Sequence, residues 1–172
     1  APALTSDGSR TLEYAYAGDL YGNLWKFDLT HASNVNQWDV AYGGGSPAPL
    51  FLAKDQDANP QPITSLPEIG RHPNGGYMVY FGTGRYFAVG DNIVNVSTPR
   101  VQSFYGIWDN GSAVSSYTDR NDRLQEQTIV YEGPPVLVDG DDPAFASVRA
   151  VSNTTFTYNS TTRRGWYMDL ES

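Results

Sequence analysis

The chain has 172 residues, enough for one domain of ordinary size or a piece of a larger one. Its 11 Lys and Arg against 19 Asp and Glu give a formal net charge of −8, which argues against nucleic acid as a partner because phosphates need clustered basic side chains. No apolar run approaches the roughly 20 residues that span a bilayer, so we expect no membrane span. The absence of Cys excludes disulfides, thiolate metal sites and a cysteine nucleophile.

The composition favours an all-β fold. Charged residues make up 17% of the chain, against a typical share of about 25%, and aromatic residues make up 13%. The 17 Gly and 11 Pro interrupt the chain often, as many short strands joined by turns require. The first residues show no charged segment followed by an apolar core, so we expect a mature or excised fragment without a signal peptide.

The first predicted element is a β-hairpin. Residues 13–17 are a short run rich in strand formers, and residues 20–23 supply the Gly and Asn of a tight turn. Residues 24–29 follow and alternate between the two faces of a second strand.

Further strands are predicted along the rest of the chain. Residues 77–81 are continuously apolar, which predicts a strand buried on both faces. Residues 119–127 have almost no apolar stripe, so this segment is predicted to be either a short helix or a loop. The remaining predicted strands are residues 85–89, 103–108, 128–132, 135–138, 156–158 and 165–170.

A short pattern occurs twice. Residues 25–29 and 166–170 both read W-x-x-D-L, and the 141 positions from Trp25 to Trp166 would hold about three propeller blades of roughly 40–50 residues. Tryptophan at such positions packs neighbouring small sheets together. We therefore expect all four tryptophans, which include Trp38 and Trp108, to serve core packing.

Five motifs follow one another along the chain, namely YAGDLYGNLWKFDL at 16–29, QPIT at 61–64, VYFGTGRY at 79–86, SFYGIWD at 103–109 and GWYMDL at 165–170. This ordered set resembles the C-terminal propeller of the PilC/PilY family, the tip-associated adhesin and assembly proteins of type IV pili. The set spans most of the chain and implies a β-propeller of modified quinoprotein type, of which residues 1–172 form a single domain or a fragment covering part of the ring. A partial ring would expose radial sheet faces.

The resemblance implies a non-catalytic protein of pilus assembly, surface attachment and twitching motility. Its partners would be minor pilins or other pilus components, and a host or surface ligand that is a protein or a glycan. It would be exported and lie at the cell surface or on the pilus. Two other classes stay open, namely a fragment of a quinone-dependent dehydrogenase, which would bind calcium and pyrroloquinoline quinone, and a glycan-binding propeller.

The sequence assigns no catalytic, cofactor-binding or metal-ligating residue. His31 and His72 lack a second histidine or a carboxylate at ligand spacing, so we expect both to be surface loop residues. No G-x-S-x-G nucleophile motif occurs, and the glycine-rich stretch 43–47 lacks the Lys that grips phosphate.

Calcium has one local candidate. Asp55, Asp57 and Asn59 space three oxygen donors two residues apart, like the opening of a calcium loop. Pro60 replaces the glycine that such a loop requires, so an Asx turn is the expected structure and calcium is kept as the alternative. The resemblance also implies a D-x-[DN]-x-[DN]-G-x-x-D loop before a strand, but the alignment through Asp7-Gly8 would need Ala3 as a ligand, and that calcium site is not transferred.

Overall fold

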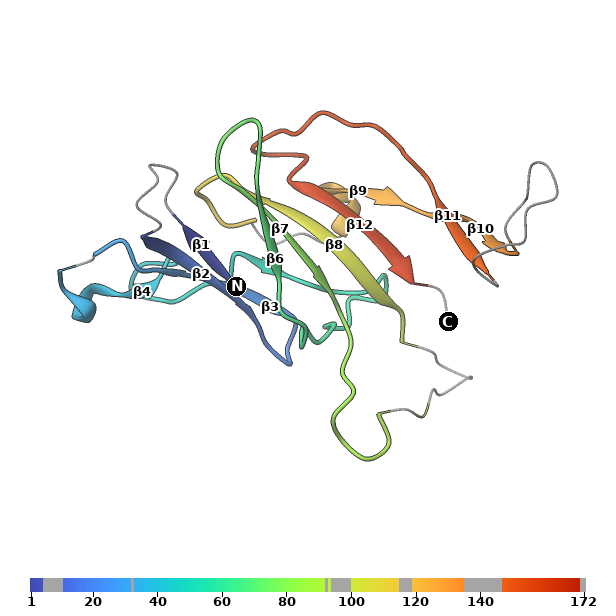
Figure 1. The fold of residues 1–172 in the computed structure, drawn as a ribbon, viewed down its shortest axis with the longest axis horizontal. Helices are drawn as coiled ribbons and strands as arrows, with labels where there is room; N and C mark the ends of the chain where they lie inside the picture. Colours follow the sequence, from blue (N-terminus) through green and yellow to red (C-terminus); the bar gives the residue numbers. More distant parts are fainter. Residues whose placement is uncertain are drawn as a thin grey trace.

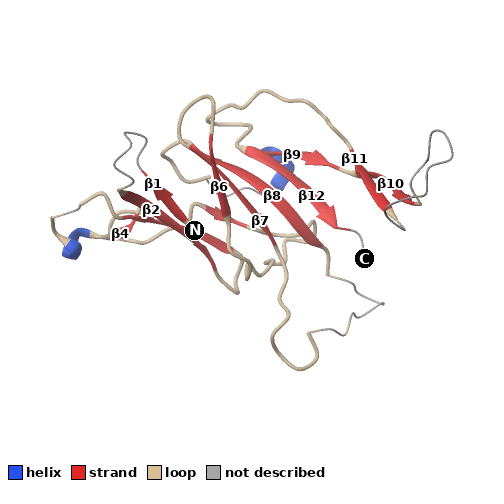
Figure 2. Ribbon diagram, viewed as in Figure 1, coloured by secondary structure: helices blue, strands red, loops and turns tan. Residues whose placement is uncertain are grey.

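The computed structural model describes residues 1–4, 11–31, 33–91, 93, 100–114, 119–134 and 147–170. Over these ranges the chain forms strands joined by loops and short 3₁₀ turns, so the predicted all-β class is confirmed (Figure 2). No helix within the described ranges is long and apolar enough to cross a membrane.

The N-terminal part of the chain forms a five-stranded sheet, here called sheet I. Its strands β1 (Pro2–Leu4), β2 (Leu12–Gly18), β3 (Asn23–Asp28) and β4 (Asp39–Val40) are adjacent in chain order, and each is antiparallel to the next. Strand β5 (Phe51–Leu52) pairs with the beginning of β3. The hairpin predicted from residues 13–29 is therefore confirmed as β2 and β3.

The turn between β2 and β3 is fixed by one carboxylate. Asp19 Oδ1 accepts hydrogen bonds from the backbone N–H groups of Tyr21 and Asn23, and its Oδ2 accepts one from Trp25 Nε1 at 2.9 Å. Gly22 has a φ of 85°, and a Cβ there would lie 2.6 Å from the Ala53 carbonyl oxygen. Glycine is therefore required both for the backbone angle and for the close approach of the next segment.

A second five-stranded sheet, here called sheet II, has a non-sequential order. It runs β6 (Glu68–Arg71), β7 (Tyr77–Gly82), β8 (Gln102–Asp109), β12 (Gly165–Leu170) and β9 (Leu124–Gln127). The first four strands are antiparallel neighbours, whereas β9 is parallel to β12. Figure 1 shows the last strand of the chain, in red, lying beside β8 after the chain has left the sheet and returned.

The excursion between β8 and β12 carries two smaller features. The 3₁₀ helix η2 (Arg120–Asp122) begins with Asp119 as its cap and leads into β9. Strands β10 (Ile129–Gly133) and β11 (Val148–Val151) then form a separate two-stranded sheet at the edge of the molecule (Figure 1). A further 3₁₀ helix, η1 (Val35–Gln37), precedes β4.

The hydrophobic core lies between sheets I and II. Tyr16 of β2 and Phe51 of β5 belong to the same buried cluster as Phe81, Tyr105 and Ile107 of sheet II. The Phe81 and Tyr105 rings stack with centroids 5.3 Å apart, and Phe51 lies 5.4 Å from Tyr105. Aromatic contacts of this kind stabilise beyond the area they bury, so these rings fix how the two sheets face each other.

Three strand predictions are not confirmed. Residues 85–89 form a turn rather than a strand, because the Asp91 carboxylate accepts the backbone N–H groups of Phe87 and Ala88 and holds the chain in a compact loop. Residues 156–158 pair with no strand that the structure describes, and Phe156 and Tyr158 contribute ring contacts instead. Residues 135–138 lie outside the described residues.

Residues 119–127 are neither a helix nor a loop throughout. One 3₁₀ turn at η2 is followed by β9, whose polar sequence LQEQ pairs with β12 along its full length.

The expectation of three blades between the two W-x-x-D-L motifs is also wrong. Trp25 lies on β3 of sheet I and Trp166 on β12 of sheet II, so the interval between them joins two five-stranded sheets of the described residues and not three.

Candidate functional site

The two histidines lie in different environments. His31 is exposed, as expected. His72 is only 7% exposed, because its ring stacks on Trp108 at 4.5 Å and meets the edge of Tyr158 at 4.4 Å, so the prediction of a surface histidine is wrong. Its Nδ1 accepts the backbone N–H of Asn74, and burial lowers the pKa of the imidazole.

The tryptophans also differ from one another. Trp108 is buried in this aromatic group, while Trp25 and Trp166 are half-buried. Trp38 remains 45% exposed, because its indole hydrogen-bonds to the carbonyl of His31 at the surface. Core packing is therefore the role of Trp108 and not of Trp38.

A buried polar network joins the two sheets around Asp109. Lys26 Nζ lies 2.7 Å from Asp109 Oδ2, and the two side chains are 7% and 0% exposed. Tyr16 donates to Oδ2 at 2.6 Å and Tyr42 donates to Oδ1 at 2.5 Å. The ammonium group also lies 3.9 Å from the centre of the Tyr14 ring. Strands β2, β3 and β8 thus meet at a single carboxylate.

The electrostatics explain why this carboxylate stays ionised. Burial alone would raise the pKa of Asp109, but the charge of Lys26 and the hydrogen bonds from Lys26, Tyr16 and Tyr42 lower it below its ordinary value. Burial and the Asp109 charge raise the pKa of both tyrosines, so their hydroxyls remain protonated donors. The oxygens of Asp109 are therefore occupied by cross-sheet partners rather than held ready for proton transfer.

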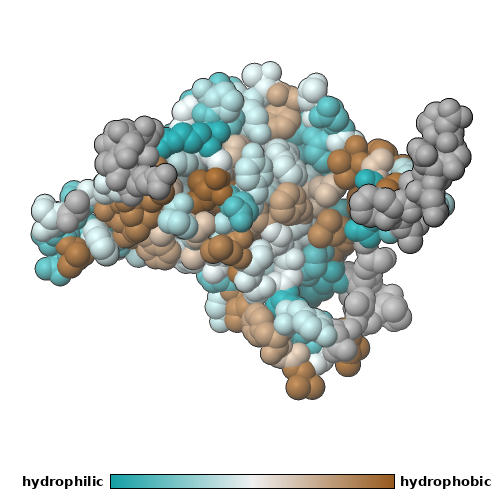
Figure 3. All heavy atoms as spheres, viewed as in Figure 1, coloured by the Kyte–Doolittle hydropathy of each residue, from teal (hydrophilic) through white to brown (hydrophobic). Residues whose placement is uncertain are grey.

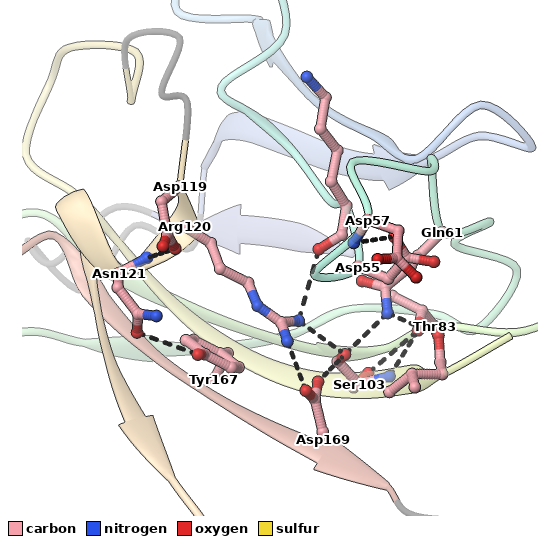
Figure 4. Close-up of polar contacts among 12 residues, drawn as sticks. Asp55, Asp57, Gln61, Thr83, Ser103, Asp119, Arg120, Asn121, Tyr167 and Asp169 are labelled. Atoms are coloured by element: carbon pink, nitrogen blue, oxygen red, sulfur yellow. Dashed lines mark hydrogen bonds and ion pairs between the residues drawn. The ribbon is translucent and has the colours of Figure 1, made fainter.

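A second polar network surrounds Arg120 (Figure 4). Arg120 forms an ion pair with Asp169 of β12, and Ser103 Oγ donates to the same carboxylate at 2.6 Å. Gln61 Nε2 donates to Ser103 Oγ at 2.8 Å, while Gln61 Oε1 accepts from Tyr105 at 2.5 Å. The network connects η2, β8, β12 and the segment after β5.

The Arg120 side chain also packs against an aromatic ring. The guanidinium carbon lies 3.9 Å from the centre of the Tyr167 ring, a cation–π distance. Tyr167 in turn donates to Asn121 Oδ1 at 3.0 Å, so η2 is held at two successive residues. Burial raises the pKa of Tyr105, at the inner end of the network, to about 12. These contacts hold η2, β8 and β12 together inside the protein.

The calcium candidate is an Asx turn, as predicted. Asp55 Oδ1 accepts the backbone N–H groups of Asp57 at 3.0 Å and Asn59 at 2.8 Å, and both Asp55 oxygens contact Asn59 Nδ2. In the described ranges no three His, Cys, Asp or Glu side chains gather as a metal site would need. Asp7 and Gly8, considered for the family's calcium loop, lie outside those ranges.

The outward face of sheet II carries an aromatic groove of about 500 Å³. Trp166 lies across Gly106, where a Cβ would come within 2.6 Å of the indole, and Phe104 packs against the same ring at 5.6 Å. None of the residues that line the groove is charged. They are Phe104, Gln127, Val151, Ser152, Asn153, Thr154, Thr155, Phe156, Tyr158, Trp166 and Met168.

A second exposed apolar feature is the loop that follows β7, of which the structure describes residues 85–91 and 93 and which is here called the 85–93 loop. Tyr86, Phe87 and Ile93 are between 66% and 77% exposed. An ion pair of 3.0 Å between Arg85 and Asp91 closes the loop at its base. Figure 3 shows hydrophobic side chains at the lower tip of the molecule, where this loop turns in Figure 1.

The two buried networks were not found from the sequence. A lysine in the middle of an alternating strand, at Lys26, and an aspartate directly after an aromatic strand, at Asp109, were the available signals. Neither signal identifies its partner, because the contacts join strands far apart along the chain. The Arg120 network gave no signal beyond the Asp169 of the W-x-x-D-L motif.

Comparisons with known proteins identify the family to which the chain belongs. A family model described as the PilY1 beta-propeller domain matches residues 1–139. A type IV pilus biogenesis factor PilY1 homolog of Xylella fastidiosa is 37% identical over 169 residues, covering 97% of this chain and 10% of that protein. The type IV pilus biogenesis factor PilY1 of Pseudomonas aeruginosa PAO1 is 39% identical over 195 residues, covering 96% of this chain and 15% of its own length.

A solved structure agrees with these matches. The crystal structure of the Pseudomonas aeruginosa PilY1 C-terminal domain superposes with a TM-score of 0.77 at 33% identity, covering 99% of this chain and 38% of that one. The chain thus spans 10–15% of the length of the relatives it matches and about two fifths of the solved domain. It belongs to the PilY1 β-propeller domain family and comprises part of the propeller.

Proposed function

We propose that the chain is a non-catalytic propeller segment of a type IV pilus biogenesis factor, which acts by binding pilus components during pilus assembly, surface attachment and twitching motility. The observation that carries this proposal is the 39% identity to Pseudomonas aeruginosa PilY1 across 96% of the chain. We place the protein outside the cytoplasm, at the cell surface or on the pilus, on the same ground.

The site geometry supports binding rather than turnover. Asp109 and Asp169, the carboxylates at the centre of the two networks, are each paired with a cation and hydrogen-bonded to further side chains. Rigid sheets that present loops are typical of recognition proteins. Exposed apolar patches mark interaction sites, and the 85–93 loop is closed at its base by an ion pair, which reduces the entropy lost on binding.

Binding to pili tests this proposal directly. Pili sheared from the source bacterium are immobilised, and the purified chain is passed over them in a biolayer interferometry experiment. We expect saturable binding at micromolar concentrations, weakened by Phe87→Ser in the 85–93 loop. Val130→Ser is the matched control, because Val130 is 63% exposed and Phe87 is 66% exposed, but Val130 lies on β10. No binding of the unsubstituted chain would contradict the proposal.

A second candidate is glycan binding at the aromatic groove, favoured by its uncharged lining. Glycan binding needs the Trp166 face to be open, whereas the pilus role is tested above at the 85–93 loop. Calorimetric titration with neutral oligosaccharides separates the two. Saturable heat that Asn153→Ala or Thr155→Ala weakens would support glycan binding, and the absence of heat would remove this candidate.

A further inference from the structure

A small pocket beside the end of β8 is lined by two arginines that form no ion pair with a carboxylate of the described residues. It measures about 170 Å³, and Arg123 and Arg164 both line it, together with Ser112, Ser160 and Thr161. Neither arginine takes part in any of the ion pairs formed by the described residues. In a chain with a net charge of −8, two neighbouring guanidinium groups that take no part in a described ion pair are unexpected.

Arg164 is a fixed positive charge at the back of the pocket. It is 2% exposed, and its guanidinium donates to the Trp108 carbonyl at 2.9 Å, to the Ser112 carbonyl at 2.8 Å and to Ser112 Oγ at 3.2 Å. These acceptors are neutral, so they satisfy the N–H groups without neutralising the charge. Asp109, which attracts Arg164 electrostatically, is already paired with Lys26.

One N–H group of Arg123 has no hydrogen-bond partner among the described residues. Its Nη1 donates to the Thr161 carbonyl, but its Nε–H is buried and has no hydrogen-bond partner among the described residues. An unsatisfied buried N–H of a charged group is costly, and native proteins normally provide a partner for it. Burial lowers the pKa of Arg164, and the charge of Arg123 lowers it further, so the two guanidinium groups repel each other. A bound anion in the pocket would relieve this repulsion.

We propose that this pocket binds one oxyanion group, a phosphate, sulfate or carboxylate, with Arg123 as its principal donor and Arg164 as a fixed positive charge behind it. The guanidinium fork matches the geometry of such groups. The volume is well below the roughly 300–1,000 Å³ of pockets for drug-sized ligands, which suits a single oxyanion group. This inference does not depend on the pilus role.

The test is calorimetric titration of the full chain with inorganic phosphate, sulfate and N-acetylaspartate, at constant ionic strength set by sodium chloride. We expect saturable one-site binding of at least one of them, weakened at least tenfold by Arg123→Gln. Arg123→Lys should also weaken binding, because lysine keeps the charge but lacks the guanidinium fork that matches an oxyanion. Arg149→Gln is the control, since Arg149 pairs with Glu132 on the separate β10–β11 sheet.

The probe or probes that bind identify the chemical source of the oxyanion group. Binding of phosphate or sulfate alone assigns a free or esterified inorganic oxyanion, and binding of N-acetylaspartate assigns a carboxylate. Circular dichroism checks that Arg123→Gln is folded, and Ser160→Ala, which removes only a hydroxyl at the pocket wall, provides a milder second variant expected to weaken binding. Absence of saturable binding for all three probes, or equal binding by Arg123→Gln, would overturn the proposal.

Discussion

Lys26 Nζ of β3 lies 2.7 Å from Asp109 Oδ2 at the end of β8, so a buried ion pair connects sheet I to sheet II. Desolvation of two charges offsets much of the Coulomb attraction between them, so such a pair adds little net stability by itself. Removal of one partner has a much larger effect, because the other charge is then left in the interior without compensation. This asymmetry makes the pair a sensitive test of how the sheets are joined.

Lys26→Met should lower the free energy of unfolding by about 3–5 kcal/mol, because Asp109 would remain buried without its cation. The measurement is urea denaturation followed by circular dichroism. Glu132→Gln, which breaks the exposed pair with Arg149 on the β10–β11 sheet, is the control and should leave the midpoint unchanged. Equal midpoints for Lys26→Met and the unsubstituted chain would show that the pair does not join the sheets.

The Asp109 carboxyl should make stability depend on pH in the acid range. Its pKa is lowered in the folded chain, whereas an unfolded Asp titrates near pH 3.9. The unfolded state therefore binds the proton first, and the stability that Asp109 contributes is present above about pH 4 and is lost as the pH falls toward the folded pKa.

Urea midpoints measured between pH 2.5 and 7 test this dependence. Asp109→Asn should be less stable at neutral pH and show a shallower decline below about pH 4. A residual decline is expected in the variant, because hydrogen bonds from nearby donors also lower the pKa values of Asp19 and Asp28. Identical slopes for the variant and the unsubstituted chain would exclude this role for Asp109.

His72 should add a second pH dependence near neutrality. Burial between Trp108 and Tyr158 lowers the pKa of its imidazole below the ordinary 6.5. The unfolded chain then takes up the proton first, so stability falls as the pH drops below about 6.5 and levels off once the folded imidazole is also protonated. His72→Phe keeps a ring in the stack and should remove this slope between pH 5 and 7.5, whereas His31→Gln at an exposed position should retain it.

Gly106 should tolerate no side chain. A Cβ at this position would lie 2.6 Å from the Trp166 indole, so Gly106→Ala must displace the ring from the strand. We expect a loss of about 1–3 kcal/mol, typical of overpacking, and a shifted Trp166 Nε1–H resonance in NMR spectra. Gly45→Ala is the matched control, because nothing lies within 4 Å of a Cβ there. An unmoved indole resonance in Gly106→Ala would show that the ring lies elsewhere.

Sequence patterns predict the long strands of this fold and miss its short or unusual ones. Apolar or alternating runs identify β2, β3, β7, β8 and β12, since each buries a face against the core. Strand β9 has no such pattern, because its place is determined by parallel pairing with β12. Residues 85–89 look like a strand but pair with none of the described strands, and Asp91 caps the loop instead.

The candidate sites depend even more on distant contacts. The Asx turn at Asp55 was predictable because its partners lie within four residues. The pairing of Lys26 with Asp109, and the burial of His72 between Trp108 and Tyr158, join segments whose proximity exists only after folding. The ordered motifs nevertheless identified the family, because they extend over nearly the whole chain and do not depend on any one contact.

The most direct test of the pilus role is a count of surface pili in the source bacterium. The gene is deleted, and the strain is complemented with the unsubstituted gene. Electron microscopy and a twitching assay should show fewer surface pili and reduced motility in the deletion strain, with both restored by the complementing copy. Unchanged piliation after deletion would contradict the role proposed for this protein.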